Sequence, residues 1–276
     1  MVNYKTLDLT RLCLRSIRKF TRCPYKVVVI DNGSNDSSTQ YLRNLPWIEL
    51  IERQTVPGES GGQAHARALQ LALDNCDTEL FVSMHSDCVI TQPGWLTLLI
   101  EKFDDKTACV GTGKIEMSSP IRDLLKNLAD FKTLKRKLQR TPDPLGIYRY
   151  YNRTVCCIYR TAILKKENLT FTMDQEKGLT AGKKLYFELV DRGYKTVELP
   201  EKHVRKYILH LTHATMVLND AQFNVRYRTK KRIHKLIKKI MNSELIRSLD
   251  EDRSLDNPNG DECLDTSGKF YGTQGT

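Results

Sequence analysis

The sequence predicts an α/β protein built on a doubly wound, mostly parallel sheet with helices on both faces. The first observation is the run of four β-formers at residues 27–30, with no polar alternation, which is typical of a strand buried on both faces. Residues 80–84 form a second run of this kind. Helical patterns separate and follow the two runs, and strands that alternate with helices in this way indicate a parallel sheet.

The first half of the chain provides the elements in order. Residues 1–6 have the pattern of the end of a strand and its exit loop, so most of a first strand is expected to be missing. A helix follows, capped by Thr6 or Asp8, whose apolar positions repeat at helical spacing through Phe20. After the strand at 27–30 we expect a helix at 37–42, a strand at 47–51, and a helix that begins after the glycine-rich turn 58–62.

The second half continues the alternation. The expected elements are strands at 80–84, 108–111, 155–159 and 195–199, and helices at 95–103, 119–140 and 183–192. Gly193 follows the last helix, which is a common stop signal.

Length and charge divide the chain into three parts. Its 276 residues suit one large α/β domain, which we assign to residues 1–222. Residues 223–242 carry eight Lys and Arg and no acid, and they predict a basic amphipathic helix. Residues 243–276 carry eight acidic side chains against three basic ones and predict a disordered tail. The net charge of +11 suits an anionic ligand or surface.

Composition also bears on the compartment. No stretch approaches the roughly 20 apolar residues of a membrane span, and the first residues lack the apolar core of a signal peptide. The eight cysteines are scattered without metal-binding spacing, which suits reduced, buried thiols. We expect a cytoplasmic protein, with peripheral attachment to the inner face of the membrane through residues 223–242 as one interpretation and a helix packed on the domain as the other.

Two carboxylates follow buried strands. Asp31 ends the run at 27–30 and Asp87 follows the run at 80–84, so both are expected at one edge of the sheet, where α/β proteins bind ligands. One acid can accept hydrogen bonds from a base or ribose, and the other can hold a divalent cation. This pairing suits a nucleotide-sugar with Mn²⁺ or Mg²⁺.

Several runs together carry a family resemblance. Residues 27–37, 61–64 and 81–89, followed by 93–96, resemble family 2 of the inverting glycosyltransferases, which have the GT-A fold. Their order and spacing match across about residues 1–105. Beyond that point the resemblance is limited to a helix, the turn at 193–195 and a late histidine.

The resemblance implies roles around the nucleotide. Asn3 and Tyr4 are expected to flank the base, and Asp31 is expected to bind it, with Asn32 beside it. Gly62, at the start of a helix, is a candidate phosphate contact, although a glycine pair is more often only a turn.

The resemblance also implies a metal site. Asp87 ends the motif that meets ribose and metal, with Ser86 in its centre and His85 where the family usually has Asp. A neutral imidazole can still bind Mn²⁺ but offers less charge to Mg²⁺. Of two late histidines, His213 matches the family better than His210 as a further ligand, and a structural histidine is an equal alternative.

An inverting transfer needs a carboxylate to take the proton of the acceptor hydroxyl. The usual Glu-Asp dipeptide is absent, and within the matching window Asp174 is our first choice and Glu176 our second. Exposed loop acids are the alternative interpretation.

These observations predict an enzyme that moves a sugar from a nucleoside diphosphate sugar to an acceptor hydroxyl with inversion, in cell-surface polysaccharide or glycolipid synthesis. The acceptor, whether glycan, lipid-linked or protein, has no motif in the sequence. The alternative is a degenerate GT-A fold that binds nucleotide or a protein partner without transfer. No nucleic-acid partner is expected, because Tyr227 is the only candidate stacking aromatic in the basic segment.

Overall fold

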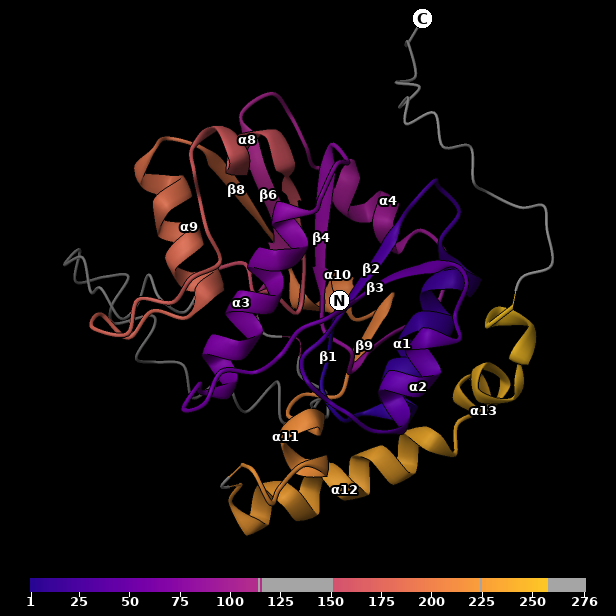
Figure 1. Cartoon of the computed structure of the whole chain (residues 1–276). Coiled ribbons are helices and arrows are strands. Elements are labelled where there is room, and N and C mark those ends of the chain that lie inside the picture. The colour runs from indigo at the N-terminus through magenta and orange to yellow at the C-terminus, as the bar shows by residue number, and fades with distance from the viewer. Residues whose placement is uncertain (114, 116–150, 224, 258–276) are drawn as a thin grey trace, which may run out of the picture.

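The chain folds around a central sheet that is covered by helices (Figure 1). The computed structural model describes residues 1–113, 115, 151–223 and 225–257. The helix expected at 119–140 lies outside this part.

One half of the sheet is formed by three parallel strands, β1 (Val2–Asn3), β2 (Val27–Asp31) and β3 (Ile48–Glu52). The other half has the order β4 (Leu80–Met84), β7 (Cys156–Arg160), β6 (Thr107–Thr112) and β8 (Lys195–Leu199). A parallel bridge between Val2 and His85 joins the halves, so the strand order is β3-β2-β1-β4-β7-β6-β8.

Only β7 runs against its neighbours in this sheet, because both of its ladders are antiparallel while the other pairs of strands are parallel. The predicted doubly wound, mostly parallel sheet is therefore confirmed for the described residues.

The two faces of the sheet bury separate apolar clusters. In β2, Val27 and Val29 point into one cluster, while Val28 and Ile30 point into the other. The first cluster is covered by α1 (Leu7–Phe20), α2 (Ser37–Arg43) and α4 (Trp95–Ile100). The second is covered by α3 (Gly61–Asp74), α8 (Thr161–Lys166) and α9 (Ala181–Asp191). Two-sided burial explains why the β2 sequence has no polar alternation.

Local capping explains where the helices begin and end. The Asp36 side chain accepts a hydrogen bond from the Ser38 amide at the start of α2. Ser60 and Gln63 form a reciprocal capping box at the start of α3. Gly193 follows α9 with φ of +80°, as expected for a glycine stop. The helix expected at 95–103 ends at Ile100, three residues early.

A short antiparallel ribbon lies beside the main sheet. Its strands are β5 (Cys88–Ile90) and β9 (Ile208–His210), with Cys88 opposite His210. The helix α10 (Glu201–Val204) precedes β9, and α11 (Ala214–Leu218) follows it. The ribbon therefore brings a late segment of the chain to the carboxyl end of β4.

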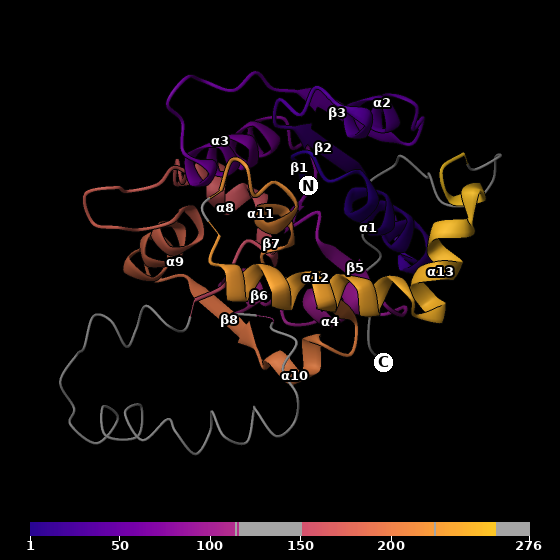
Figure 2. The same cartoon turned by 90° about the horizontal axis from the view of Figure 1, so that it is seen from below.

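Two α-helices and a short 3-10 helix complete the described chain. The basic segment forms α12 (Tyr227–Met241), which lies across one end of the molecule, seen face-on in Figure 2. It is followed by α13 (Glu244–Glu251) and the short 3-10 helix η1 (Arg253–Leu255). Within the described part of the chain, every helix falls short of the length and apolarity that a bilayer crossing demands.

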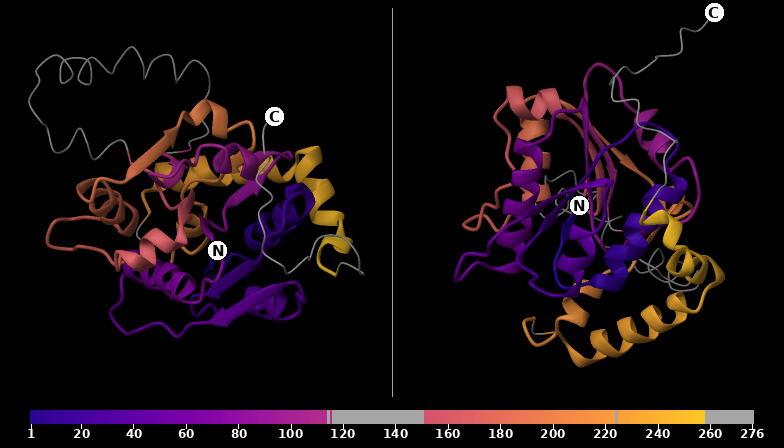
Figure 3. Two further views of the ribbon diagram at one scale, coloured as in Figure 1. Left: turned by 90° about the horizontal axis from the view of Figure 1, so that it is seen from above. Right: turned by 45° about the vertical axis from the view of Figure 1, so that its right-hand side comes forward.

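The expectation of disorder from residue 243 onward is wrong for residues 244–255. Figure 3 shows α13 beside α1, and Ile246 and Leu249 are buried in a cluster with Leu9 and Leu12 of α1. The acidic composition suggested a solvated tail, but apolar residues at helical spacing make one face of α13 suitable for burial. Residues 258–276 lie outside the described part.

Arg15 of α1 binds residues 249–256 to the domain, and we call this contact the Arg15 clasp. Its buried guanidinium donates to both carboxylate oxygens of Asp256, at 2.9 and 2.5 Å, and to the carbonyl oxygen of Leu249 at 3.0 Å. Tyr41 Oη donates to the same carboxylate at 2.7 Å. Burial alone would raise the pKa of Asp256, but the hydrogen bonds from Arg15 and Tyr41 outweigh it and lower the pKa.

We expect Asp256→Asn to lower the free energy of unfolding at pH 7 by about 1–3 kcal/mol, because it removes the charge from a partly buried bidentate pair. A carboxylate with a lowered pKa stabilises the fold above its unfolded-state pKa and loses this effect as the pH falls through its folded-state value. The difference from wild type should therefore shrink as the pH falls below about 4. Urea titrations at pH 7, 4 and 3 measure it.

The matched control is Asp252→Asn. Asp252 is 4.0 Å from Lys19 in a more exposed pair, which is worth at most about 1 kcal/mol. Equal stability of Asp256→Asn and wild type at pH 7 would contradict the role of the clasp.

Candidate functional site

The site lies where β4 ends. The His85 amide donates to the carbonyl oxygen of Val155 at 3.0 Å, and the Cys88 amide donates back to the His85 carbonyl oxygen at 3.1 Å. This tight turn holds Asp87 at the start of the ribbon, where it is 5% exposed. The pairing of Cys88 with His210 then places the His210 side chain next to Asp87.

Three side chains converge in this turn. Ligand atoms of His85, Asp87 and His210 all lie within 4.8 Å of one another. Oδ1 of Asp87 is 3.8 Å from Nδ1 of His85 and 3.3 Å from Nε2 of His210. Within the described residues, this buried oxygen has no partner with hydrogen-bond geometry. A buried carboxylate oxygen without a partner is costly, so the arrangement suits a cation between these atoms.

The surroundings of His210 support a metal-binding role. Its Nδ1 lies 3.0 Å from the carbonyl oxygen of Ile115, which can only accept a hydrogen bond, so Nδ1 carries the proton. In the neutral ring, Nε2 then turns a lone pair toward Asp87, and two facing lone pairs need a proton or a cation between them. Metal-binding histidines commonly donate their second N–H to a carbonyl in this way.

The pKa shifts agree with this description. Burial lowers the pKa of His210, but the Asp87 carboxylate outweighs it and raises the pKa above its usual value. Burial also raises the pKa of Asp87, and His210 and His85 outweigh it, so the pKa of Asp87 is lowered. Asp87 is therefore ionised at neutral pH, as a metal ligand must be.

A second pair of side chains, which the sequence analysis missed, supports His85. Oγ1 of Thr154 lies 3.4 Å from Nε2 of His85 and 3.5 Å from Nε2 of His65 on α3. The rings of His65 and His85 meet edge to face, with centroids 4.9 Å apart. Burial lowers the pKa of His85 to about 4 and that of His65 to about 3, so both rings are neutral at pH 7.

Thr154 therefore occupies one nitrogen of His85 and leaves Nδ1 facing Asp87. Only the position of His65, three residues after Gly62 at the start of a helix expected on this edge, could have drawn attention to it in the sequence.

The structure corrects the prediction of His213 as a metal ligand. The family resemblance favours His213 as the late ligand, but this residue is exposed, lies at the N-cap of α11 with φ of +68°, and is outside the group of His85, Asp87 and His210 found among the described residues. The register of β9 on β5 selects His210 instead. Ser86, predicted between the two ligands, is buried in the turn.

The predicted base-binding acid is engaged inside the protein. Asp31 is 2% exposed, and its carboxylate accepts hydrogen bonds from Asn3 Nδ2 at 2.7 Å, Ser34 Oγ at 2.5 Å and Thr39 Oγ1 at 2.8 Å. Asn3 is fully buried in the same network, and Asn32 Oδ1 accepts from Arg53 at 2.5 Å. Asp31 and Asn3 thus fix the loop after β2 through contacts within the protein.

Tyr4 and the glycine pair lie against a later part of the chain. The Tyr4 ring meets Phe223 edge to face at 6.4 Å, and its hydroxyl donates to the Gln222 side chain. A Cβ on Gly61 would be 2.9 Å from Phe223. A Cβ on Gly62 would be 3.1 Å from the sulfur of Met173. Close packing at the start of α3 therefore gives a structural reason for both glycines.

The two candidate bases lie in one turn. Asp174 and Leu179 pair their backbones, and Asp174 Oδ1 accepts from the Lys177 amide at 3.0 Å. Glu176 is exposed in this turn. Because Met173 packs against Gly62, the turn borders the start of α3, the helix that carries His65.

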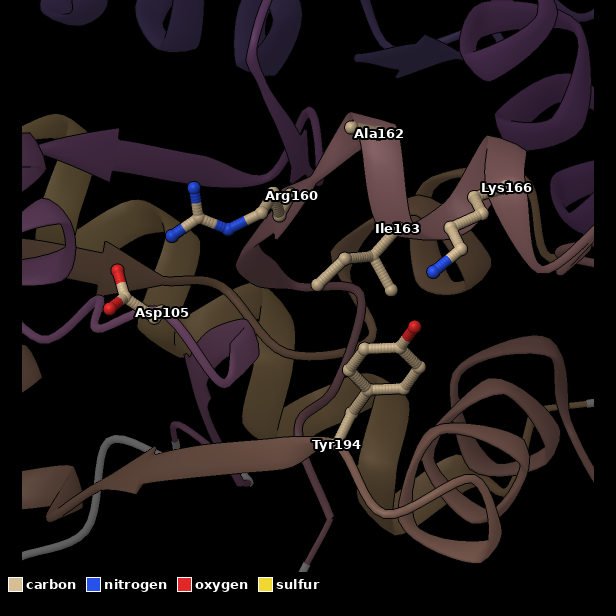
Figure 4. Close-up of a pocket in the computed structure, with 6 residues that line it drawn as sticks. All are labelled: Asp105, Arg160, Ala162, Ile163, Lys166 and Tyr194. Carbon is tan, nitrogen blue, oxygen red and sulfur yellow. The ribbon is translucent and has the colours of Figure 1, made fainter.

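A separate pocket of about 300 Å³ lies at the opposite edge of the sheet (Figure 4). It is lined by Asp105, Arg160, Ala162, Ile163, Lys166 and Tyr194. Arg160 is opposite Leu80 at the start of β4, whereas the histidine group follows the end of β4. This pocket is therefore distinct from the candidate site.

Solved structures show remote similarity. The mannosyltransferase PcManGT from Pyrobaculum calidifontis, solved with GDP-Man and Mn²⁺, is 17% identical over 72% of this chain and 53% of its own, with a TM-score of 0.49. S. aureus TarS 1-349 with UDP-GlcNAc is 18% identical over 84% of this chain and 68% of its own, with a TM-score of 0.45. The chain spans about half the length of PcManGT.

A third solved structure is glucosyl-3-phosphoglycerate synthase from Mycobacterium tuberculosis in complex with phosphoglyceric acid. It is 16% identical over 72% of this chain and 68% of its own, with a TM-score of 0.44. No curated protein matches the sequence.

The family comparison is more extensive. The family model described as glycosyl transferase family 2 matches residues 1–167, which include β1 to β7, His65, His85 and Asp87. This range covers more than half of the chain and includes the turn that carries His85 and Asp87, while β9 with His210 lies beyond it. The chain belongs to glycosyl transferase family 2.

Proposed function

We propose that the protein transfers a sugar from a nucleoside diphosphate sugar to an acceptor hydroxyl. The observation that carries this proposal is the convergence of His85, Asp87 and His210 at the carboxyl edge of the sheet, in a chain of glycosyl transferase family 2. We further propose inversion at the anomeric carbon and a role in cell-surface polysaccharide or glycolipid synthesis.

The residues of the site fit a divalent cation. Two imidazoles and one carboxylate are a donor set that transition metals accept, while Mg²⁺ prefers oxygen ligands. Two features would be explained by a bound cation, namely Oδ1 of Asp87, which has no hydrogen-bond partner in the described part of the chain, and the carbonyl-anchored ring of His210. A bound cation would supply positive charge to a diphosphate leaving group. We therefore propose Mn²⁺ in preference to Mg²⁺.

The remaining roles follow from position. Asp31, Asn3 and Asn32 shape the loop after β2, and Tyr4 offers a partly exposed ring beside it, so we propose this loop as the nucleotide side of the site. For the base that accepts the acceptor proton we propose Asp174, because its turn borders α3, and Glu176 is the second choice. Gly62 and Ser86 then contribute backbone at the edge of the site.

Binding without transfer is the second candidate function. It is supported by the Asp174 carboxylate, which accepts a hydrogen bond within its own turn, with its other oxygen 3.8 Å from Lys177 Nζ. The carboxylate is thus engaged with its own turn rather than directed at the His85, Asp87 and His210 group.

We expect purified protein to hydrolyse or transfer at least one sugar from a panel of nucleoside diphosphate sugars when Mn²⁺ is present. Asp87→Asn should lower turnover at least about a hundredfold, since it removes the charged ligand while keeping the shape. Release of the nucleoside diphosphate measures turnover. Nucleotide binding by the wild type without release of diphosphate from any donor would favour the second candidate function.

We expect His210→Ala to weaken Mn²⁺ binding at least tenfold, on the order seen when even supporting residues of metal sites are removed. The matched control is His213→Asn, because Asn tolerates the positive φ of this position and His213 lies outside the group. Titration of Mn²⁺ by calorimetry reports both affinities. Equal losses in the two variants would contradict the assignment of His210.

We expect Asp174→Asn to reduce the rate of transfer by about a hundredfold or more while the Kd for the nucleoside diphosphate stays near the wild-type value, because general bases contribute on the order of 10²–10⁴. Glu176→Gln, a substitution of the same kind at an exposed position in the same turn, should retain most of the rate. If Glu176→Gln shows the larger loss, the two roles are reversed.

Proton NMR of the product anomer tests inversion.

A further inference from the structure

The helix α12 has two chemically different faces. Ile233 and Ile240 are buried, and Leu236, Ile237 and Met241 pack beside them against the domain. The opposite face consists of exposed cations, which we call the basic face: Arg228, Lys231, Arg232, Lys235, Lys238 and Lys239. At 3.6 residues per turn these six positions fall within about a third of the helix circumference.

The charge of the basic face is not neutralised by the domain. Among the residues that the structure describes, Lys230 is the one cation of α12 with an ion pair, to Asp220, and it is outside the basic face. Three acids of the following segment lie beside cations of α1, Asp250 with Arg11, Asp256 with Arg15 and Asp252 with Lys19. The basic face is therefore open to an anionic partner.

Apolar side chains extend from the same end of the molecule. Of the five exposed large apolar residues in the described chain, three lie on α11 or at the start of α12. They are Met216, Leu218 and Tyr227, which are 40%, 43% and 74% exposed. The two helices pack against each other. Exposed apolar side chains next to a stripe of Lys and Arg are typical of helices that lie in a membrane interface.

We propose that α11 and α12 form a docking surface for the headgroups of an anionic lipid bilayer. The six cations would meet lipid phosphates, while Met216, Leu218 and Tyr227 would enter the boundary of the acyl chains. A nucleic acid would use the charge but leave two aliphatic side chains exposed, and the surface offers it a single stacking aromatic. The bilayer uses both halves of the surface.

The position of this surface relates it to the candidate site. Three residues, 211–213, separate His210 from α11, and Phe223, just before α12, lies against Gly61. Docking through α11 and α12 would therefore bring the carboxyl edge of the sheet near the bilayer. This last step rests on the proposed function, and it indicates an acceptor that is itself anchored in the bilayer.

The docking surface can be tested with the full chain and lipid vesicles. Co-sedimentation is measured with phosphatidylcholine vesicles and with vesicles that also contain phosphatidylglycerol. Wild type should bind the anionic vesicles at least about tenfold more tightly, and this preference should fall as the salt concentration rises. The triple variant Lys231→Glu, Lys235→Glu, Lys238→Glu should lose at least about tenfold in affinity for the anionic vesicles.

The matched control reverses three exposed lysines outside α11 and α12, as Lys102→Glu, Lys106→Glu and Lys166→Glu. Lys102 follows α4 and Lys166 ends α8, and both helices lie far from α12 in Figure 1. This variant has the same net charge as the first and therefore controls for net charge. Because its substitutions lie away from α12, its vesicle binding should stay near wild type. Circular dichroism verifies that both variants are folded.

Equal binding to neutral and anionic vesicles, or equal losses in the two triple variants, would overturn the proposal. Binding to duplex RNA or DNA in place of anionic vesicles would also overturn it. Release of nucleoside diphosphate in the absence of vesicles should be the same in the basic-face variant as in wild type. Failure of the docking surface is thereby distinguished from failure of the proposed function.

Discussion

The site depends on the burial of one carboxylate. A charged Asp87 in the interior loses its water and would be strongly destabilising without opposite charge or hydrogen bonds. Its nearest polar neighbours are His210 of the ribbon at 3.3 Å and the neutral His85 at the end of β4 at 3.8 Å, so the opposite charge must come from a proton on His210 or from a cation between these groups. The other nitrogen of each ring has its own partner, the Ile115 carbonyl oxygen for His210 and Thr154 Oγ1 for His85. The ribbon of β5 and β9, the turn after β4 and α3 each contribute a residue to the surroundings of this carboxylate.

The sequence identifies those features that are written in local patterns. Strands β2 and β4 were predicted because burial on both faces leaves continuous β-formers, and Asp87 was predicted because it follows such a strand. The local sequence does not show whether His210 or His213 lies next to Asp87. This depends on the register of a ribbon whose strands are more than 100 residues apart in the sequence. The disorder expected after residue 243 was wrong for the same reason, because Arg15, the partner of Asp256, is 241 residues away.

Several residues that resemble ligand-binding positions also hold the fold together. Asp31 and Asn3 share a buried network, Gly61 lies so close to Phe223 that a Cβ would force a shift, and Gly62 packs tightly against the Met173 side chain. If a substitution at one of these positions lowered activity, the loss of a ligand contact could not be separated from the local unfolding of the loop that the residue supports. Residues such as Thr154 and His210, whose bonds serve the site directly, separate the two effects more cleanly.

One continuous segment links three regions of the molecule. It begins at His210, touches Tyr4 through Gln222 and Phe223, and enters α12 at Tyr227. If a nucleotide bound beside Tyr4 displaced this segment, it would change the free energy with which α12 binds the proposed bilayer. Thermodynamic reciprocity makes the reverse effect equal in size, so a surface that favours one arrangement of the segment alters affinity beside Tyr4 by the same factor. The contacts of Gln222 and Phe223 with Tyr4 would therefore couple the two binding events.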